Sequence, residues 1–166
     1  MRVQVTNAQR DAAVNTARMA RLARCAIRRL RIRTPGTLAI TFIGSHRMRA
    51  LNKRFLRHDW PTDVLSFRYD GAGTRRGHAA RHGELMVGEI LVSPRQAQAY
   101  AKRAGIPYAE ELCRYVVHGL LHWRGHEDRT PAERRRMRAR EDWLLAWCGG
   151  NSRDASILPI GRRREK

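Results

Sequence analysis

Short β-branched segments alternate with helical patterns over the first two thirds of the chain, and this order constrains the fold most. Residues 37–43 (TLAITFI) and 84–93 (ELMVGEILVS) are typical of strands in a covered sheet. Residues 63–67 (DVLSF) predict another strand, and residues 2–5 a short edge strand. The sequence therefore predicts a single α/β (α+β) domain, with a small mixed sheet flanked by helices.

Capping and turn residues mark the helices between these strands. Ser45 is expected to be an N-cap, Pro94 suits a first helical turn, and Thr130-Pro131-Ala132-Glu133 reads as a capping box. The expected helices cover residues 10–30, 45–55, 94–104, 108–123 and 130–147.

Composition divides the chain into a core domain and two irregular segments. Residues 1–150 carry the strand and helix patterns and form the predicted domain. Residues 151–166 end in GRRREK and predict a basic, disordered tail. Residues 70–83 are rich in glycine and arginine and predict a mobile loop.

The charge balance points to a polyanionic partner. The 166 residues include 34 Lys and Arg against 15 Asp and Glu, a formal net charge of +19. Such a chain attracts polyanions over long range, and nucleic acid is the expected partner. No apolar run approaches the roughly 20 residues of a membrane helix, so no membrane association is expected.

The cysteines and the N-terminus favour a cytoplasmic location. Cys25, Cys113 and Cys148 are an odd number, lie far apart and form no CxxC pair. We expect them to be unpaired thiols in a reducing compartment. The N-terminal residues lack the apolar segment of a signal peptide.

The segment 118–128 (HGLLHWRGHED) carries the strongest chemical signal. His118 and His122 are four residues apart on a predicted helix, so both rings lie on one face and can bind one ion. Gly125 can adopt the left-handed conformation that ends a helix and turns the chain back. Asp128 then falls at the position of a third ligand, with His126 as the alternative. Three protein ligands leave a fourth position open, as in catalytic zinc sites.

One residue of this segment argues against a protease. Zinc proteases with the HExxH motif place a general-base glutamate directly after the first histidine. Gly119 occupies that position here. A zinc metalloprotease-like hydrolase remains an alternative, together with a non-catalytic RNA-binding ribosome assembly factor.

Three motifs in the same order resemble the YbeY rRNA-maturation endoribonucleases. The segment 118–128 resembles the family pattern HGxLHxxGYDH. Residues 51–67 (LNKRFLRHDWPTDVLSF) are similar to LNxxYRxxDxPTDVLSF, and residues 88–90 (GEI) are similar to GDI. Three of the departures from the pattern bear on the site. Asp128 stands where the family has its third histidine, His126 replaces the tyrosine, and Leu56 replaces a functional arginine.

The resemblance implies a zinc-dependent, single-strand-specific endoribonuclease. Residues 1–150 would form a YbeY-like metal-dependent RNase domain, with Zn²⁺ held by His118, His122 and Asp128. The implied activity is maturation of the 16S rRNA 3′ end of the small subunit, together with ribosome quality control. The implied partners are single-stranded regions of ribosomal RNA, and ribosomal small-subunit proteins or an assembly GTPase.

Further residues receive roles as expectations. Arg57, or failing it Arg54, would stabilise negative charge on the phosphate, because a guanidinium matches phosphate oxygens. Glu89 would be a general base or would orient a ligand histidine. For the tryptophans, the expectation is that Trp60 and Trp123 stack on unpaired bases and that Trp143 and Trp147 belong to the core.

Overall fold

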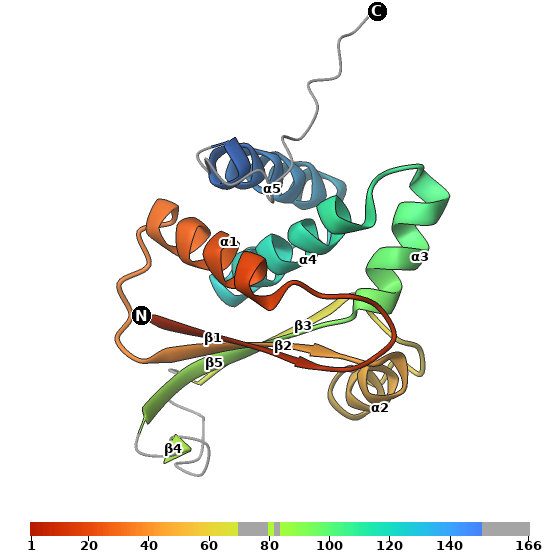
Figure 1. Cartoon of the computed structure of the whole chain (residues 1–166), viewed down its shortest axis with the longest axis horizontal. Helices are drawn as coiled ribbons and strands as arrows, with labels where there is room; N and C mark the ends of the chain where they lie inside the picture. The colour runs from red at the N-terminus through yellow and green to blue at the C-terminus, as the bar shows by residue number, and fades with distance from the viewer. Residues whose placement is uncertain (70–79, 82–83, 151–166) are drawn as a thin grey trace, which may run out of the picture.

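The computed structural model describes residues 1–69, 80–81 and 84–150. The predicted tail, residues 151–166, and most of the predicted mobile loop, residues 70–83, lie outside the described residues. In the described residues, strands and helices alternate along the chain up to residue 68, two further strands follow, and three consecutive helices come last. Figure 1 shows a sheet with most of the helices on one side.

A mixed sheet forms the centre of the described part. Its strands lie in the order β1 (Arg2–Ala8), β2 (Thr37–Ile43), β5 (Glu84–Val92) and β3 (Val64–Arg68). β1, β2 and β5 are parallel, and β3 runs antiparallel to β5. The short strand β4 (Ala80–Arg81) pairs with the beginning of β5. The prediction of a small mixed sheet flanked by helices is confirmed.

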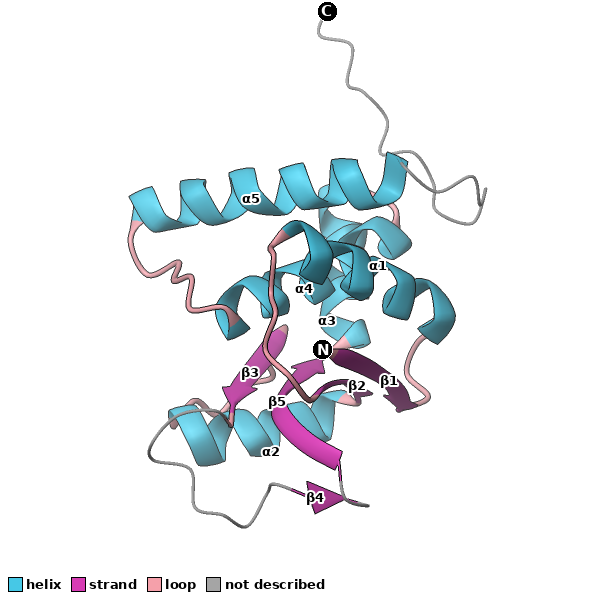
Figure 2. Ribbon diagram, turned by 90° about the vertical axis from the view of Figure 1, so that its left-hand side faces the viewer, coloured by secondary structure: helices cyan, strands magenta, loops and turns pink. Residues whose placement is uncertain are grey.

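Most of the helices form two layers on one face of the sheet. α1 (Thr16–Arg29) and α4 (Tyr108–Trp123) lie against the sheet, and α3 (Pro94–Ala104) lies beside α4. α5 (Pro131–Gly150) covers α1 and α4 from the side away from the sheet. α2 (Ser45–Leu56) is on the opposite side of the sheet (Figures 1 and 2).

α4 is enclosed because its side chains are apolar around most of its circumference. A helix of this kind must be covered on several sides, and the sheet, α1, α3 and α5 supply that cover. The main core cluster joins it to β2 and β5 through large side chains that are fully buried. Among them are Leu38, Ile40, Phe42, Ile90, Val116, Val117, Leu120 and Leu121.

Most helix boundaries follow the predicted capping signals. The capping box is confirmed, because the backbone N–H of Glu133 donates to Oγ1 of Thr130 and Oε2 of Glu133 accepts from the backbone N–H of Thr130. α1 begins later than predicted, because Asn15 caps it by accepting from the N–H of Arg18. The prediction that Ser45 is an N-cap is wrong. Gly44 holds that position, and Asp11 accepts from the backbone N–H of Ser45.

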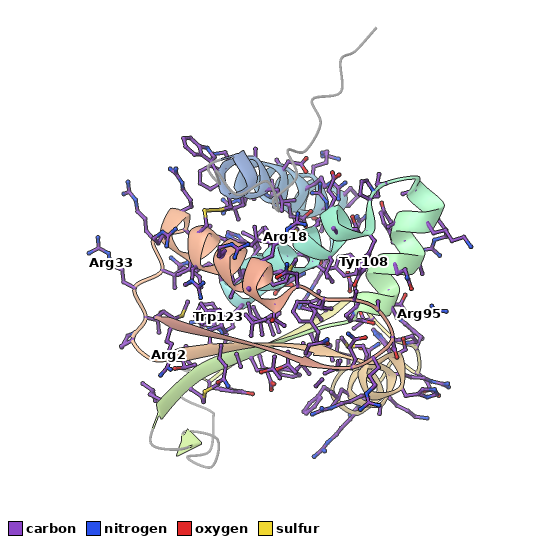
Figure 3. All side chains as sticks on the ribbon, in the orientation of Figure 1. Arg2, Arg18, Arg33, Arg95, Tyr108 and Trp123 are labelled. Carbon is purple, nitrogen blue, oxygen red and sulfur yellow. A yellow bond between two sulfur atoms is a disulfide. The ribbon has the colours of Figure 1, made fainter. Side chains whose placement is uncertain are left out.

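The prediction of three unpaired thiols is wrong for two of them. Cys25 of α1 and Cys148 of α5 form a disulfide, with Cα atoms 5.7 Å apart. Figure 3 shows it as a yellow bond between the two helices. The cysteines are 123 positions apart and meet only because α5 packs along α1. Cys113 is a free, buried thiol.

Candidate metal centre

The end of α4 brings the chain back toward its own histidines. The N–H of Gly125 donates to the carbonyl of His122 (2.8 Å), and the N–H of His126 donates to the carbonyl of Leu121 (3.0 Å). This pair of bonds is a Schellman motif, and it needs a left-handed residue at Gly125, whose φ is +95°. The predicted role of this glycine is confirmed, and the turn carries Asp128 back beside the helix.

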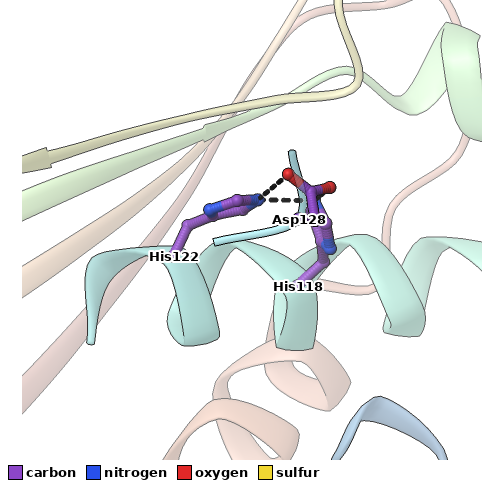
Figure 4. Close-up of side chains that lie close together, drawn as sticks. All are labelled: His118, His122 and Asp128. Carbon is purple, nitrogen blue, oxygen red and sulfur yellow. Dashed lines mark hydrogen bonds and ion pairs between the residues drawn. The ribbon is translucent and has the colours of Figure 1, made fainter. Parts of the chain in front are cut away.

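His118, His122 and Asp128 converge on one point (Figure 4). The two Nε2 atoms of the histidines are 3.0 Å apart. Oδ2 of Asp128 is 3.8 Å from Nε2 of His118, and Oδ1 is 3.7 Å from Nε2 of His122. Around a tetrahedral zinc ion with ligand distances of about 2.0–2.2 Å, neighbouring ligand atoms are about 3.3–3.6 Å apart. The three side chains therefore fit a metal ion in spacing and in donor chemistry.

A buried carboxylate from α5 fixes the first histidine. Nδ1 of His118 donates to Oε1 of Glu141 at 2.8 Å, and Glu141 is only 4% exposed. With its proton on Nδ1, the ring presents the lone pair of Nε2 to the site. A carboxylate on the far nitrogen of a histidine is the usual support of a metal ligand.

Glu141 is itself held by a buried arginine. Nη1 of Arg114 lies 3.1 Å from Oε2 of Glu141 and 2.6 Å from Oδ1 of Asp142. Glu111, one turn before Arg114 on α4, places Oε2 3.8 Å from Nε of the same arginine. Arg114 is 8% exposed, so this network compensates buried charge behind His118. We call Glu111, Arg114, Glu141 and Asp142 the supporting network.

The electrostatic environment shifts the pKa values of the two histidines in opposite directions. Burial lowers the pKa of His122, and the charge of His118 lowers it further, which favours the neutral ring that a metal needs. Burial also opposes charge on His118, but the hydrogen bond to Glu141 and the charges of Asp63, Glu141 and Asp128 raise its pKa overall. Asp63, the residue before β3, is thus one of three carboxylates whose negative charge raises the pKa of His118.

His126 is not part of the group of convergent side chains. Nη1 of Arg140 donates to Nε2 of His126 at 2.7 Å, since a guanidinium has no acceptor. Burial and then the positive charges of Arg140 and Arg124 lower the pKa of His126. The alternative third ligand of the sequence analysis is therefore occupied by an arginine of α5.

Comparison with known proteins assigns the family. The family model described as endoribonuclease YbeY matches residues 4–149. The chain is 33% identical over 148 residues to the endoribonuclease YbeY of Corynebacterium kroppenstedtii, which covers 88% of this chain and 73% of that relative. The chain belongs to the endoribonuclease YbeY family. The Thermobifida fusca YbeY is 34% identical over 130 residues, 78% of this chain and 83% of its own.

A solved structure supports the fold of this YbeY family member. The solution structure of TM1509 from Thermotoga maritima superposes with a TM-score of 0.59 at 18% identity, over 99% of both chains. At that identity the likeness concerns the arrangement of helices and strands.

Within the described residues, no helix is long and apolar enough to cross a membrane.

The arginine predicted for catalysis lies on another element. Arg57 is the C-cap of α2, where its backbone has a φ of +62°, and its side chain is exposed. In the described part of the chain its guanidinium has no hydrogen-bond or ion-pair partner, and Arg57 is not part of the group formed by the two histidines and Asp128. Leu56, which replaces the arginine of the YbeY pattern, is 53% exposed beside it. The catalytic role of Arg57 remains a prediction.

Glu89 lies on the other face of the sheet. Ile90 faces α4, because a Cβ added at Gly119 would lie 2.5 Å from its Cγ2 atom, so Glu89 must point the opposite way. There it accepts hydrogen bonds from Thr41 and Tyr69. The prediction that Glu89 orients a ligand histidine is wrong, because the sheet lies between Glu89 and α4 and the partners of Glu89 are Thr41 and Tyr69. Its role as a general base remains a prediction.

The tryptophans also differ from expectation. Trp123 is 2% exposed, packs over Gly88 of β5, and lies between the helices and the sheet (Figure 3), so it cannot stack on a base. Trp143 and Trp147 were expected in the core but are 43% and 42% exposed. Trp60 is 58% exposed and stacks on His58. Its stacking on an RNA base remains a prediction.

Gly119 sets the distance between α4 and the sheet. A Cβ at this position would lie 2.5 Å from Cγ2 of Ile90 and 2.9 Å from Cγ1 of Val64. The hydroxyl of Ser66 donates to the carbonyl of Gly119 at 3.0 Å, which fixes the same contact. The position of the protease glutamate therefore faces packed β-strands, and a general base has no room there.

Gly119→Ala is expected to lower the free energy of unfolding by about 1–3 kcal/mol, because α4 must move away from β3 and β5 to accept the methyl group. The shift would also loosen the contact between His118 and Glu141. Urea unfolding of both proteins measures the first effect, and metal affinity the second. A variant as stable as the wild type would show that the helix is free to shift at this contact.

Proposed function

We propose that the protein is a zinc-dependent endoribonuclease that cuts single-stranded RNA, with His118, His122 and Asp128 as the metal ligands. The convergence of these three side chains in a member of the endoribonuclease YbeY family carries the proposal. Two imidazoles and one carboxylate form a three-ligand set that leaves a fourth position for water or substrate. Residues 1–150 would be the metal-dependent RNase domain, and residues 151–166 a basic tail that adds charge.

The substrate we propose is ribosomal RNA of the small subunit. The net charge of +19 suits a polyanion, and the motif resemblance points to maturation of the 16S rRNA 3′ end and to ribosome quality control. Small-subunit proteins or an assembly GTPase would then be protein partners. Ribosomes place this work in the cytoplasm, where reductants oppose disulfides. There the Cys25–Cys148 bond would be shielded in part, because Cys148 is buried and Cys25 is half-buried.

In this proposal, some residues would bind the metal or the phosphate, and Glu141 would orient a metal ligand. A zinc ion held by the three ligands would stabilise negative charge on the scissile phosphate and lower the pKa of water toward about 7. Glu141 keeps the proton of His118 on Nδ1, so that Nε2 remains a ligand. Arg57, next to the position of the family arginine, would bind phosphate oxygens through its guanidinium. Its exposed side chain and lack of a described partner leave it available for that role.

Asp128→Ala tests the proposal directly. The wild type is expected to hold about one zinc per chain, and the variant to lose both the metal and at least about 100-fold in cleavage of a single-stranded RNA. Glu127→Ala is the matched control, because Glu127 is an exposed acid of the same loop, paired with Arg129. Elemental analysis and a cleavage assay with a labelled oligonucleotide give the two readouts.

The outcomes separate the remaining functions. Unchanged metal and cleavage in Asp128→Ala would move the third ligand elsewhere. A wild type that binds RNA but holds no metal and cuts nothing would favour a non-catalytic assembly factor. The replacement of a histidine by Asp128 and of an arginine by Leu56 makes that outcome worth measuring.

A further inference from the structure

One flank of α5 presents arginines and tryptophans in a single row. Arg136, Arg140, Trp143 and Trp147 are spaced by four, three and four residues, so they follow one side of the helix. All four are exposed. The buried side of α5 is formed by other residues, namely Met137, Glu141, Leu144, Leu145 and Cys148.

The row continues onto α1 at its C-terminal end. The guanidinium carbon of Arg29, in the last turn of α1, lies 3.7 Å from the ring centroid of Trp147. The neighbouring disulfide between Cys25 and Cys148 holds the two helices together at this point. Arg29 therefore supports the indole of Trp147, and the ring stays 42% exposed.

The arginine part of the row contacts the loop that carries Asp128. Arg140 donates to His126, which is two residues from the proposed ligand Asp128. Seven residues of helix separate Arg140 from Trp147, a rise of about 10 Å. The row thus leads away from the loop of the metal centre along the outer helix.

We propose that this row, which we call the Arg–Trp track (Arg29, Arg136, Arg140, Trp143 and Trp147), binds the single-stranded nucleic acid that extends beyond the metal centre. The identity of the strand as the substrate RNA rests on the proposed function. Guanidinium groups match phosphate oxygens, and indole rings stack on unpaired bases without regard to sequence. The track contributes both groups, with Arg136 and Arg140 on the part of α5 that follows the metal-centre loop and Trp143 and Trp147 farther along the helix.

Charge favours an RNA occupant over a protein or a second copy of this chain. The acidic residues between positions 136 and 147 are Glu141 and Asp142, and both turn to the opposite flank, where they pair with Arg114. The charged side chains of the track are therefore all cationic. A second copy of this chain would bring further positive charge, since the net charge is +19. In the described part of the chain, Trp143 has no ring or cation partner, so its faces are open to a base.

The test compares a long and a short RNA on the full chain with its metal. Trp143→Ala/Trp147→Ala is expected to bind a fluorescent single-stranded 20-mer about 100-fold more weakly, since each of the two lost stacks weakens binding by about tenfold. Cleavage of a tetranucleotide that occupies only the metal centre should not change. Tyr100→Ala is the matched control, because Tyr100 is an aromatic ring on α3 with 39% exposure.

A second variant separates stacking from any change in folding. Trp143→Leu keeps an apolar side chain and leaves the Arg29–Trp147 contact intact. It should bind the 20-mer about tenfold more weakly, and binding of RNA should quench less indole fluorescence than in the wild type. If both tryptophan variants bind the 20-mer as tightly as the wild type, the proposal that the track binds RNA is wrong. This conclusion holds even if the variants lose a dimer or a protein partner.

The two proposals fail in different ways. If the wild type cuts RNA and the track variants bind the 20-mer normally, the track is wrong and the nuclease function stands. If the wild type cuts nothing but binds the 20-mer through the two tryptophans, the nuclease function is wrong and the track stands.

Discussion

His118→Ala is expected to abolish cleavage of single-stranded RNA, with a loss of about three orders of magnitude or more. The substitution removes one of three proposed ligands and leaves Glu141 buried without its histidine. Metal catalysis is worth several kcal/mol of transition-state stabilisation, which corresponds to a rate factor of about that size. RNA binding should remain largely intact, because the positive surface does not depend on this residue. Single-turnover cleavage, zinc content and oligonucleotide affinity measure the three effects.

Glu141→Gln is expected to weaken the same site to a smaller extent, by disturbing the hydrogen bond that orients His118. An amide at this position must turn its NH₂ group either toward the Nδ1–H of His118 or toward Nη1 of Arg114, so two donors face each other. The expected loss is about 10–100-fold in metal affinity or activity, smaller than that of His118→Ala. His46→Ala, an exposed histidine of α2, is the control for both variants. Equal activity of His118→Ala and His46→Ala would remove His118 from the site.

Arg114→Met is expected to destabilise the protein by about 3–5 kcal/mol. The arginine is 8% exposed and is the closest cation to Glu141, Asp142 and Glu111 within the supporting network. Removing it leaves the buried carboxylates of Glu141 and Glu111 without that partner, and an uncompensated buried charge costs about this much. For a chain of this length the melting temperature should fall by roughly 6–20 °C. Calorimetry measures the shift, and zinc affinity should fall in parallel because Glu141 is free to leave His118.

Arg138→Met provides the comparison for this variant. Arg138 approaches the same acids, at 3.6 Å from Glu141 and 3.9 Å from Asp142, but its side chain is 51% exposed. Solvent screens an exposed pair, so this substitution should cost less than about 1 kcal/mol. If both variants melt at the same temperature, burial of Arg114 adds nothing, and the supporting network is not a source of stability.

The three proposed ligands could be predicted because their arrangement is local in sequence. A four-residue spacing on a helix and a glycine that ends the helix place His118, His122 and Asp128 together within eleven residues. The same reasoning predicted strand β2 and helix α4 with their observed bounds, since a short β-branched segment and an apolar helix are local patterns. Neither prediction depends on how distant segments pack.

The supporting network was missed because it joins α4 to α5. Glu141 comes four residues after Met137 and three before Leu144, so it falls on the apolar side of α5. A charged residue in such a row signals a buried partner, but the sequence does not say which one. The prediction for Trp143 and Trp147 was wrong for a related reason, namely that only one side of α5 is buried. Trp143 and Trp147 have helical spacing, but they lie on the flank that the core does not reach.

The disulfide makes the larger part of the protein a covalent ring. Cys25 and Cys148 are 123 positions apart in the sequence. The ring that their bond closes contains β2, β3, β5, α4 and all three proposed ligands. A single cut by a protease anywhere between the cysteines opens this ring but releases no fragment. Both pieces stay joined through sulfur, so a nicked molecule keeps one mass on a non-reducing gel and separates into two only after reduction.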